Sequence, residues 1–324
     1  MALNYNDLLT TTLENRSGKL ADNVTNNNAL LKRLKEKGKI RTIDGGTKIV
    51  EELEYGEGDM IWYSGYDKID YKQKDLFTAA EYSMKMAAVP VAINGEDMLK
   101  NSGKERMINL FEKRILNAEK TMNNRMAEAI YGDGTENAGK SIGGLKLLIA
   151  DSPTTGTVGG IDRATYDWWR NQASTASAPL TADTIRPAMD ALYLKCCRGT
   201  DKPDLLVADD TMYSLYESSL QPMQRFTNPK VAEAGFTTLK YKGADVIFDG
   251  GQGGNCPAGH MYFLNTDYIY LRPHKDRNMR VFGGDRMAIN QDAIYKLIGW
   301  AGNMTMSNAK LQGVLINGTD STGA

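Results

Sequence analysis

The sequence predicts an α+β fold in which one long helix lies across a sheet and many short strands follow it. Three observations predict this. Residues 103–131 form one amphipathic helical pattern, shorter helical patterns with caps follow it, and short runs typical of strands crowd the C-terminal third. The long pattern has one apolar stripe and one polar face, as expected for a helix that packs on a sheet on one side and meets water on the other.

Composition limits the class of protein. The chain has 324 residues, of which 41% are hydrophobic, and this suffices for one or two domains with cores of their own. Lys and Arg (39) nearly balance Asp and Glu (40), which gives a formal net charge of -1. A strongly basic nucleic-acid binder would not have this balance, whereas a protein that lies near packed DNA without gripping it could.

No stretch approaches the roughly 20 apolar residues needed to span a bilayer. Residues 1–6 carry neither the basic head nor the apolar run of a signal peptide, so we expect a protein that starts in a cytoplasm and has no membrane partner. Cys196 and Cys197 are adjacent and Cys256 stands alone. This spacing implies no disulfide framework.

Residues 1–46 are polar and rich in Asn, and we expect them to form an arm that lies on something else. The arm contains a basic run, interrupted only by Glu36, that consists of Lys32, Arg33, Lys35, Lys37, Lys39 and Arg41. Two interpretations stay open for this run. It is either a solvated helix end, where cations are favoured, or a surface that binds a partner.

Residues 47–93 predict a long hairpin. Thr47–Tyr55 is one strand candidate, and Ala80–Ala88 shows the alternation of a second, while Pro90 suits an edge strand. One face of the second strand would carry Tyr82, Met84 and Met86. The tip between the strands carries large apolar and aromatic side chains that no helical or strand period would bury, namely Ile61, Trp62, Tyr63 and Tyr66. Loops of this length are usually functional or disordered, so we expect the tip to be an interface between subunits. The alternative is that these rings fold back onto the core of their own subunit.

The helix predicted over residues 103–131 begins at a capping box formed by Ser102 and Glu105. Its apolar stripe recurs at spacings of three and four residues and consists of Ile108, Phe111, Ile115, Ala118, Met122, Met126 and Ile130. Gly132 ends it.

Mixed helices and strands follow. We expect a strand over Leu145–Ile149, a helix over Thr184–Arg198, a buried strand over Leu205–Ala208 and then a helix capped by Asp209 or Asp210. The further strand candidates are Ala244–Phe248, Met261–Leu264, Tyr268–Leu271, Met287–Trp300 and Asn303–Ile316.

Gly134–Ser141 satisfies the P-loop pattern G-x-x-x-x-G-K-S, and Leu205–Asp209 could supply the acidic partner of an ATPase. A phosphate-binding loop of this kind needs a strand before it and a helix after it, because backbone N–H groups and a helix N-terminus converge on the phosphates. Here the long helix precedes the motif and a strand is expected to follow. The match is therefore interpreted as a decoy, with Lys140 in no catalytic role.

Other signals of chemistry are weaker. His260 and His274 are the only histidines, and Cys256 with His260 lacks the second ligand pair of a zinc site. The serines show no G-x-S-x-G elbow. We therefore expect no catalytic residues, no cofactor and no metal, and a protein that is not an enzyme.

Several stretches resemble phage major capsid proteins of the Hong Kong 97 type. Gly45–Leu53 looks like the start of the extended loop of that family, Phe77–Ser83 like its return, and residues 103–131 like its spine helix. Thr181–Asp210 resembles a helix and strand of the axial domain, and Asn303–Asn308 with Leu315 and Ile316 resembles the C-terminal strand. None of these stretches is a strict motif, but they occur in the order of the family.

The resemblance implies a Hong Kong 97-type fold with an arm (1–46), an extended hairpin loop (47–93), a peripheral domain (94–163 and 276–302) and an axial domain (164–275 and 303–320). It implies a major capsid protein that self-assembles as hexamers and pentamers into an icosahedral head around double-stranded DNA. The other partners implied are a separate scaffold protein, a portal protein and, by proximity alone, the packaged DNA. The expected location is the virion, after assembly in the host cytoplasm. The alternatives are an encapsulin-like shell and a P-loop NTPase.

We further expect the arm and the hairpin to be complementary in charge between subunits. The hypothesis pairs Lys32, Arg33, Lys35 and Lys37 of one subunit with the acidic residues Glu51, Glu52, Glu54 and Glu57 of a neighbour. Pairing within one subunit is the alternative. Exposed pairs are individually weak, so their expected effect is on register and rate of assembly more than on stability.

Overall fold

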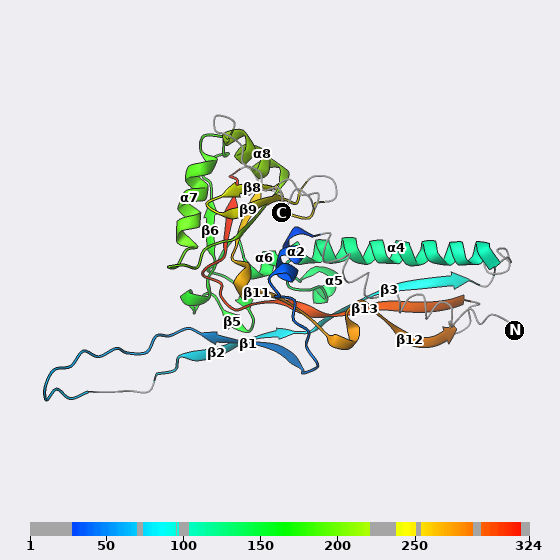
Figure 1. Ribbon diagram of the computed structural model, residues 1–324, viewed down its shortest axis with the longest axis horizontal. Helices are drawn as coiled ribbons and strands as arrows, with labels where there is room; N and C mark the ends of the chain where they lie inside the picture. The colour runs from blue at the N-terminus through cyan, green and yellow to red at the C-terminus, as the bar shows by residue number, and fades with distance from the viewer. Residues whose placement is uncertain are drawn as a thin grey trace.

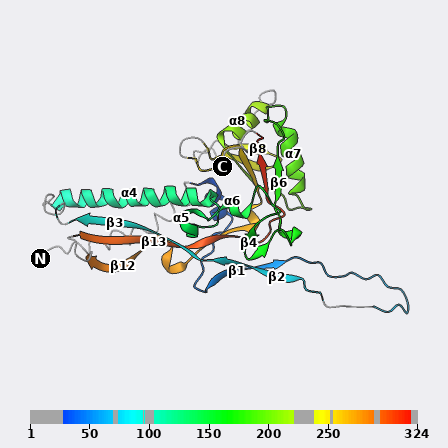
Figure 2. The same ribbon diagram turned by 180° about the vertical axis from the view of Figure 1, so that it is seen from behind.

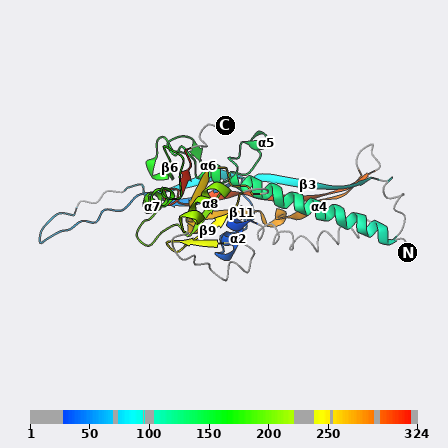
Figure 3. The same cartoon turned by 90° about the horizontal axis from the view of Figure 1, so that it is seen from above.

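The computed structural model describes residues 28–69, 74–94, 96, 104–220, 238–250, 254–287 and 293–318. In this part of the chain, the hairpin and the long helix extend from opposite ends of a central body, and a unit of sheet and helices rises from that body (Figures 1 and 2). Seen from above, the hairpin and the helix again point away from each other along the longest dimension (Figure 3).

The long helix, α4 (Lys104–Tyr131), packs along a four-stranded sheet. The central strand of that sheet is β13 (Ala293–Met306). It pairs on one side with β3 (Lys85–Asn94) and on the other with β11 (Ile269–Pro273) and β12 (Arg280–Met287), always antiparallel. The edge position predicted by Pro90 is confirmed, because β3 pairs only with β13 among the described strands.

The predicted apolar stripe of α4 is confirmed where its side chains are described. They are Ile115, Ala118, Met122, Met126 and Ile130, and none is more than 6% exposed. The side chains of Ile108 and Phe111 and the Ser102–Glu105 capping box lie outside the described residues. The 3.6-residue period therefore places one face of the helix against the sheet.

The upright unit contains a six-stranded sheet in the order β6, β14, β10, β7, β9, β8 (Figure 1). These strands are β6 (Gln172–Thr175), β14 (Gly313–Ile316), β10 (His260–Leu264), β7 (Leu205–Ala208), β9 (Ala244–Phe248) and β8 (Thr238–Tyr241). The helices α7 (Ile185–Lys195) and α8 (Asp210–Ser219) pack on one face. The opposite face joins the core that includes α4.

Local capping explains α8. The Asp209 carboxylate accepts a hydrogen bond from the N–H of Met212 at 2.9 Å, so Asp209 rather than Asp210 is the N-cap. The same carboxylate accepts from the N–H of Gly259 at 2.6 Å, which ties the helix to the turn before β10. The predicted buried strand β7 is fully buried on both faces.

Three expectations about elements are wrong. Leu145–Ile149 is not a strand, because Leu145–Leu148 forms a short helix, α6, whose buried residues Leu145, Leu148 and Ile149 follow helical spacing. Ala80–Ala88 is not one strand, because β2 (Phe77–Ser83) ends before Met84 and β3 continues in another sheet. The strands expected to break near residues 300–303 are instead one strand, β13, with Gly302 packed close to the backbone of Arg272.

The remaining described elements are short. They are α2 (Ala29–Glu36), β1 (Lys48–Glu54), α5 (Glu136–Gly139), β4 (Thr157–Val158), β5 (Ile161–Asp162) and the 3-10 turns η1 (Asp167–Trp169), η2 (Thr266–Tyr268) and η3 (Lys275–Arg277).

The described part of the arm, residues 28–46, lies on its own subunit. Leu30, Leu31 and Leu34 of α2 are at most 1% exposed. The chain then runs parallel to β11, with the N–H of Arg41 donating to Leu271 O at 3.0 Å. Residues 28–44, called the strap below, therefore link the six-stranded sheet to the four-stranded sheet. Residues 1–27 lie outside the described residues.

Candidate interface on the projecting hairpin

The hairpin is a two-stranded antiparallel sheet with one buried and one exposed face. Lys48 of β1 pairs with Ser83 of β2, and the register continues to Glu54 and Phe77. Alternate side chains on one face are buried, namely Ile49, Glu51, Leu53, Ala80 and Tyr82. The strand period thus seats the hairpin's first part, its root, on the body, and the chain beyond it projects into solvent (Figure 1).

The tip residues predicted from sequence are exposed in the structure. Trp62 is 85% exposed and Tyr66 fully exposed, while Ile61 and Tyr63 are also outside any core. Met60 is a further exposed apolar residue, at 74%, that the sequence analysis did not single out. A run of large apolar side chains on a projecting segment has no packing role within this subunit, and such surfaces usually mark a partner site.

Glu51 is buried at the hairpin root. Its carboxylate accepts two hydrogen bonds from the Arg272 guanidinium, at 2.6 and 2.7 Å, and one from the Thr305 hydroxyl at 2.7 Å. Arg272 lies on β11 and Thr305 on β13. Glu51 therefore pairs within its own subunit, which removes it from the surface that we expected to meet a neighbour's arm.

Tyr82 anchors the other strand of the hairpin. Its hydroxyl donates to Met306 O at 3.1 Å and accepts from Met306 N–H at 3.3 Å, at the end of β13. Next to it, the N–H of Glu81 donates to Gly159 O at 2.8 Å. Gly159 has a φ of +60°, and a Cβ there would lie 2.7 Å from the Ala80 side chain, so the close approach requires glycine.

An aromatic stack lies where the root ends. The ring of Tyr55 stacks on Trp168, with centroids 5.1 Å apart, and Trp168 contacts Tyr166 and Trp169 in turn. Beside this stack is a hollow of about 400 Å³ lined by both hairpin and body residues, including Glu57, Lys195 and Arg198. The end of the root therefore contacts the body near η1 and the end of α7.

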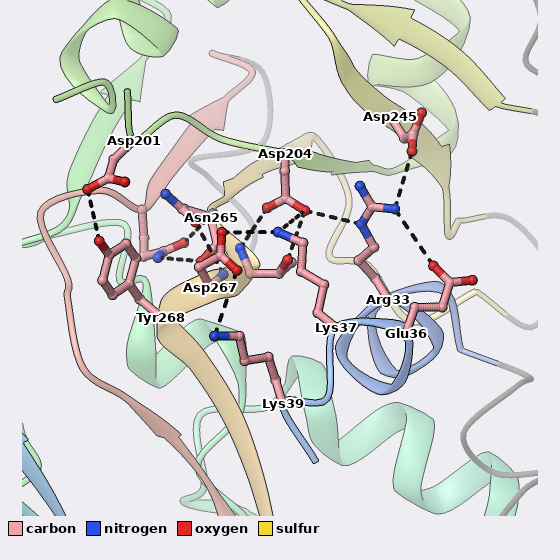
Figure 4. Close-up of polar contacts among 12 residues, drawn as sticks. Arg33, Glu36, Lys37, Lys39, Asp201, Asp204, Asp245, Asn265, Asp267 and Tyr268 are labelled. Carbon is pink, nitrogen blue, oxygen red and sulfur yellow. Dashed lines mark hydrogen bonds and ion pairs between the residues drawn. The ribbon is translucent and has the colours of Figure 1, made fainter. Parts of the chain in front are cut away.

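The basic run of the arm meets acidic residues of its own body (Figure 4). Arg33 lies 3.1 Å from Asp204 and 3.7 Å from Asp245, and Lys37 lies 3.1 Å from Asp204 and 3.2 Å from Asp267. Asp204 precedes β7, Asp245 lies within β9 and Asp267 lies in η2, all distant in sequence from the arm, and no local pattern marked them. Lys32 and Lys35 lie on the same helix, α2.

Asp204 is the centre of this network. It also accepts hydrogen bonds from the N–H and the hydroxyl of Thr266, at 2.7 and 2.8 Å. Burial favours the neutral acid, but the bonds from Thr266 and the Lys37 ammonium outweigh it and hold the pKa of Asp204 below its ordinary value. The carboxylate is thus charged at neutral pH, and it fixes the strap to the body.

The remaining acidic residues of the expected interface, Glu52, Glu54 and Glu57, are exposed. The structure therefore separates the predicted set in two. Glu51, Arg33 and Lys37 make contacts within the subunit, whereas the tip residues and Glu52, Glu54 and Glu57 face solvent.

The P-loop match does not have the geometry of a nucleotide site. Helix α4 precedes it and α6 follows it, so the strand expected after it is also absent there. The Glu136 carboxylate accepts the N–H groups of Asp133 and Gly134, at 3.3 and 3.1 Å. A carboxylate thus occupies the backbone donors at the start of the motif, and among the described residues no strand directly precedes the motif to aim it at a phosphate.

The structure also shows the surroundings of His260 and Cys256, the residues considered for catalysis or metal binding. His260 Nε2 lies 3.2 Å from Asp151, which raises the pKa of His260 above its usual value although burial opposes this. The Cys256 thiol donates to the backbone oxygen of His260 at 3.7 Å. Among the described residues there is no group of three His, Cys, Asp or Glu side chains suited to a metal. None of the described helices has the length and apolar character required to cross a bilayer.

No protein-family model and no curated protein matches the chain. Solved structures do. The capsid subunit of cyanophage A-1(L) matches with a TM-score of 0.66 and 14% identity, over 87% of this chain and 92% of that one. The capsid protein of a native GTA particle matches with a TM-score of 0.59 and 9% identity, over 87% and 89%. An encapsulin complex from Synechococcus elongatus matches with a TM-score of 0.51 and 11% identity, over 87% and 86%.

The chain therefore has the fold of shell-forming proteins, and the predicted α+β class is confirmed. More particularly, it has the Hong Kong 97-type fold of phage capsid subunits, as the order of the hairpin, the long helix and the later strands predicted.

Proposed function

We propose that this protein is the major capsid protein of a tailed phage, which assembles into an icosahedral shell of hexamers and pentamers around double-stranded DNA. Fold alone does not decide function. The observation that carries the proposal is the hairpin tip, where Trp62, Tyr63 and Tyr66 are 65% or more exposed on a segment that projects from the body. Burial of these apolar side chains becomes favourable when a second copy of the chain covers them.

The proposed role is mechanical and not enzymatic. The root is fixed to the body by buried polar contacts, and the tip presents apolar area to a neighbour. Aromatic anchors of this kind commonly dominate interface energies. The proposed partners are further copies of this chain, a separate scaffold protein, a portal protein and, by proximity, the packaged DNA. The proposed location is the virion, with assembly in the host cytoplasm.

The proposal retains the division into arm, hairpin loop, peripheral domain (94–163 and 276–302) and axial domain (164–275 and 303–320). Strand β13, which spans Ala293–Met306, is then shared by the last two parts.

Electron microscopy and mass measurement of the purified protein, alone and with its scaffold protein, test the proposal. Closed particles of uniform size are expected. A protein that stays monomeric at every concentration and with its scaffold would contradict it.

The encapsulin match favours one second candidate, a shell that encloses protein cargo. The contents of particles isolated from their natural source separate the two. Double-stranded DNA supports the phage head, and a protein cargo without DNA supports the compartment.

A further inference from the structure

The hairpin is joined to the body by two short links. The strap leads into β1 through Gly45 and Gly46, and Gly46 has a φ of +111°, which glycine adopts at least cost. On the other side β2 ends at Ser83 and β3 begins at Lys85 in a different sheet. Since neither link is a continuous paired strand, contacts at the root must determine the direction in which the hairpin projects.

Buried side-chain contacts from both strands of the root meet one end of the four-stranded sheet. Glu51 of β1 reaches Arg272 and Thr305, and Tyr82 of β2 reaches Met306. The Glu51–Arg272 contact is bidentate, so it fixes orientation as well as distance. Glu51 is 6% exposed, and each of its neighbours on the buried face of β1, Ile49 and Leu53, is apolar.

A buried charge at this position is not explained by stability. Removing the two charges from water costs free energy, and apolar residues of similar size often stabilise a protein equally well or better. The strand period would accept another β-branched side chain here. The Glu51–Arg272 pair constrains geometry, and stability alone does not require a charged pair here. The pair is therefore better explained by a role in positioning the hairpin than by a role in stabilising the fold.

The length of the hairpin magnifies an error at its root. Trp62 lies eleven positions after Glu51, a reach of roughly 35 Å if the chain is extended. A rotation of about 10° at the root then moves the tip by about 6 Å, while packed binding sites tolerate displacements of only about 0.5 Å.

We propose that Glu51 is a positioning residue for assembly: its buried pair with Arg272 sets the angle of the hairpin against the four-stranded sheet and so delivers the tip to its site on a second copy of the chain. This inference rests on the proposed function, because it takes the tip to be an interface.

The test compares three variants in the full-length chain. Glu51→Gln removes the charge with little change in shape. Glu81→Gln is the matched control on the same hairpin, because Glu81 is exposed and makes a surface pair with Lys48. Asp209→Ala is the control for stability, because it removes the buried N-cap of α8, a helix of the upright unit that lies away from the hairpin (Figure 1).

Two quantities are measured for each variant. The first is the distance distribution between spin labels, carried by non-natural amino acids at Phe77 and Lys120, in unassembled subunits. The second is the fraction of subunits in closed particles, at a temperature where every variant is folded. In Glu51→Gln we expect the distribution to shift or broaden and the assembled fraction to fall about tenfold, which corresponds to about 1.4 kcal/mol at one contact. In Glu81→Gln and Asp209→Ala we expect the wild-type distribution.

A reversal provides the rescue. Glu51→Arg combined with Arg272→Glu should recover part of both quantities relative to Glu51→Arg alone. An unchanged distance distribution in Glu51→Gln would overturn the inference, and so would an assembly defect that Asp209→Ala reproduces at the same unfolding midpoint. If wild-type protein forms no particles, the proposed function fails instead, and the distance measurement still decides whether Glu51 positions the hairpin.

Discussion

Truncating the aromatic side chains of the hairpin tip should prevent assembly and leave the folding of the subunit intact. In the double variant Trp62→Ala with Tyr63→Ala, two side chains are removed that are 85% and 65% exposed in the subunit. Surface substitutions without packing contacts usually change the free energy of unfolding by no more than about 0.5 kcal/mol. We therefore expect a soluble subunit with a thermal unfolding transition close to that of the wild type.

The expected effect on assembly is much larger. Aromatic anchors at the centre of an interface commonly contribute about 2 kcal/mol or more each when truncated. A loss of even about 1.4 kcal/mol weakens one contact tenfold, and every copy in a closed shell repeats that contact. The double variant should therefore fail to form shells under conditions in which the wild type assembles.

Light scattering and electron microscopy measure assembly, and calorimetry measures folding. Leu194→Ala is the control, because Leu194 is 66% exposed on α7 and lies outside the hairpin. Loss of the unfolding transition in the double variant would mean that the rings belong to a core. Normal assembly of the double variant would mean that the tip is not the interface.

The remaining predictions concern charge and the P-loop match. The pKa of Asp204 is lowered in the folded state. Its contribution to stability is therefore present above its unfolded pKa of about 3.9 and is lost as pH falls through the lower, folded pKa. In Asp204→Asn, the free energy of unfolding should no longer decrease over this pH range as it does in the wild type. Reversing Arg33 and Lys37 to Glu should lower the thermal midpoint of the isolated subunit, since both pair with its own body, and an unchanged midpoint would place their partners on another subunit. Reversing Glu52, Glu54 and Glu57 to Lys should slow assembly without changing that midpoint, as followed by light scattering. Lys140→Ala should alter neither assembly nor ATP affinity, and micromolar ATP binding that this substitution abolishes would refute the decoy interpretation.

Periodicity and local capping rules predicted the elements whose side chains are plainly buried in the core or hydrogen-bonded to nearby backbone. The stripe of α4 from Ile115 to Ile130, the buried strand β7 and an Asp cap at position 209 or 210, which the structure places at Asp209, follow from short-range rules of burial and backbone hydrogen bonding. The strand predicted over Leu145–Ile149 was wrong because a short apolar run does not distinguish a strand from one turn of buried helix.

The candidate site was only partly predictable. The tip was predicted because its aromatic residues lack any period that would bury them. The partners of the charged residues were not, since Glu51 and Arg272 are 221 residues apart and Arg33 and Asp204 are 171 apart. Charge sums along the sequence suggested that arm and hairpin attract each other, but in the folded chain Glu51 and the arm residues Arg33 and Lys37 pair with the body, and the other acidic residues of the hairpin set are exposed.

The central claim is that the hairpin tip binds a second copy of the chain. A cryo-EM reconstruction of assembled particles tests it most directly, at a resolution that shows aromatic side chains. The account predicts that Trp62, Tyr63 and Tyr66 are buried against a neighbouring subunit, with the Glu51–Arg272 pair intact at the root of each hairpin. A reconstruction in which these rings remain in solvent, or pack on the subunit that carries them, would contradict it.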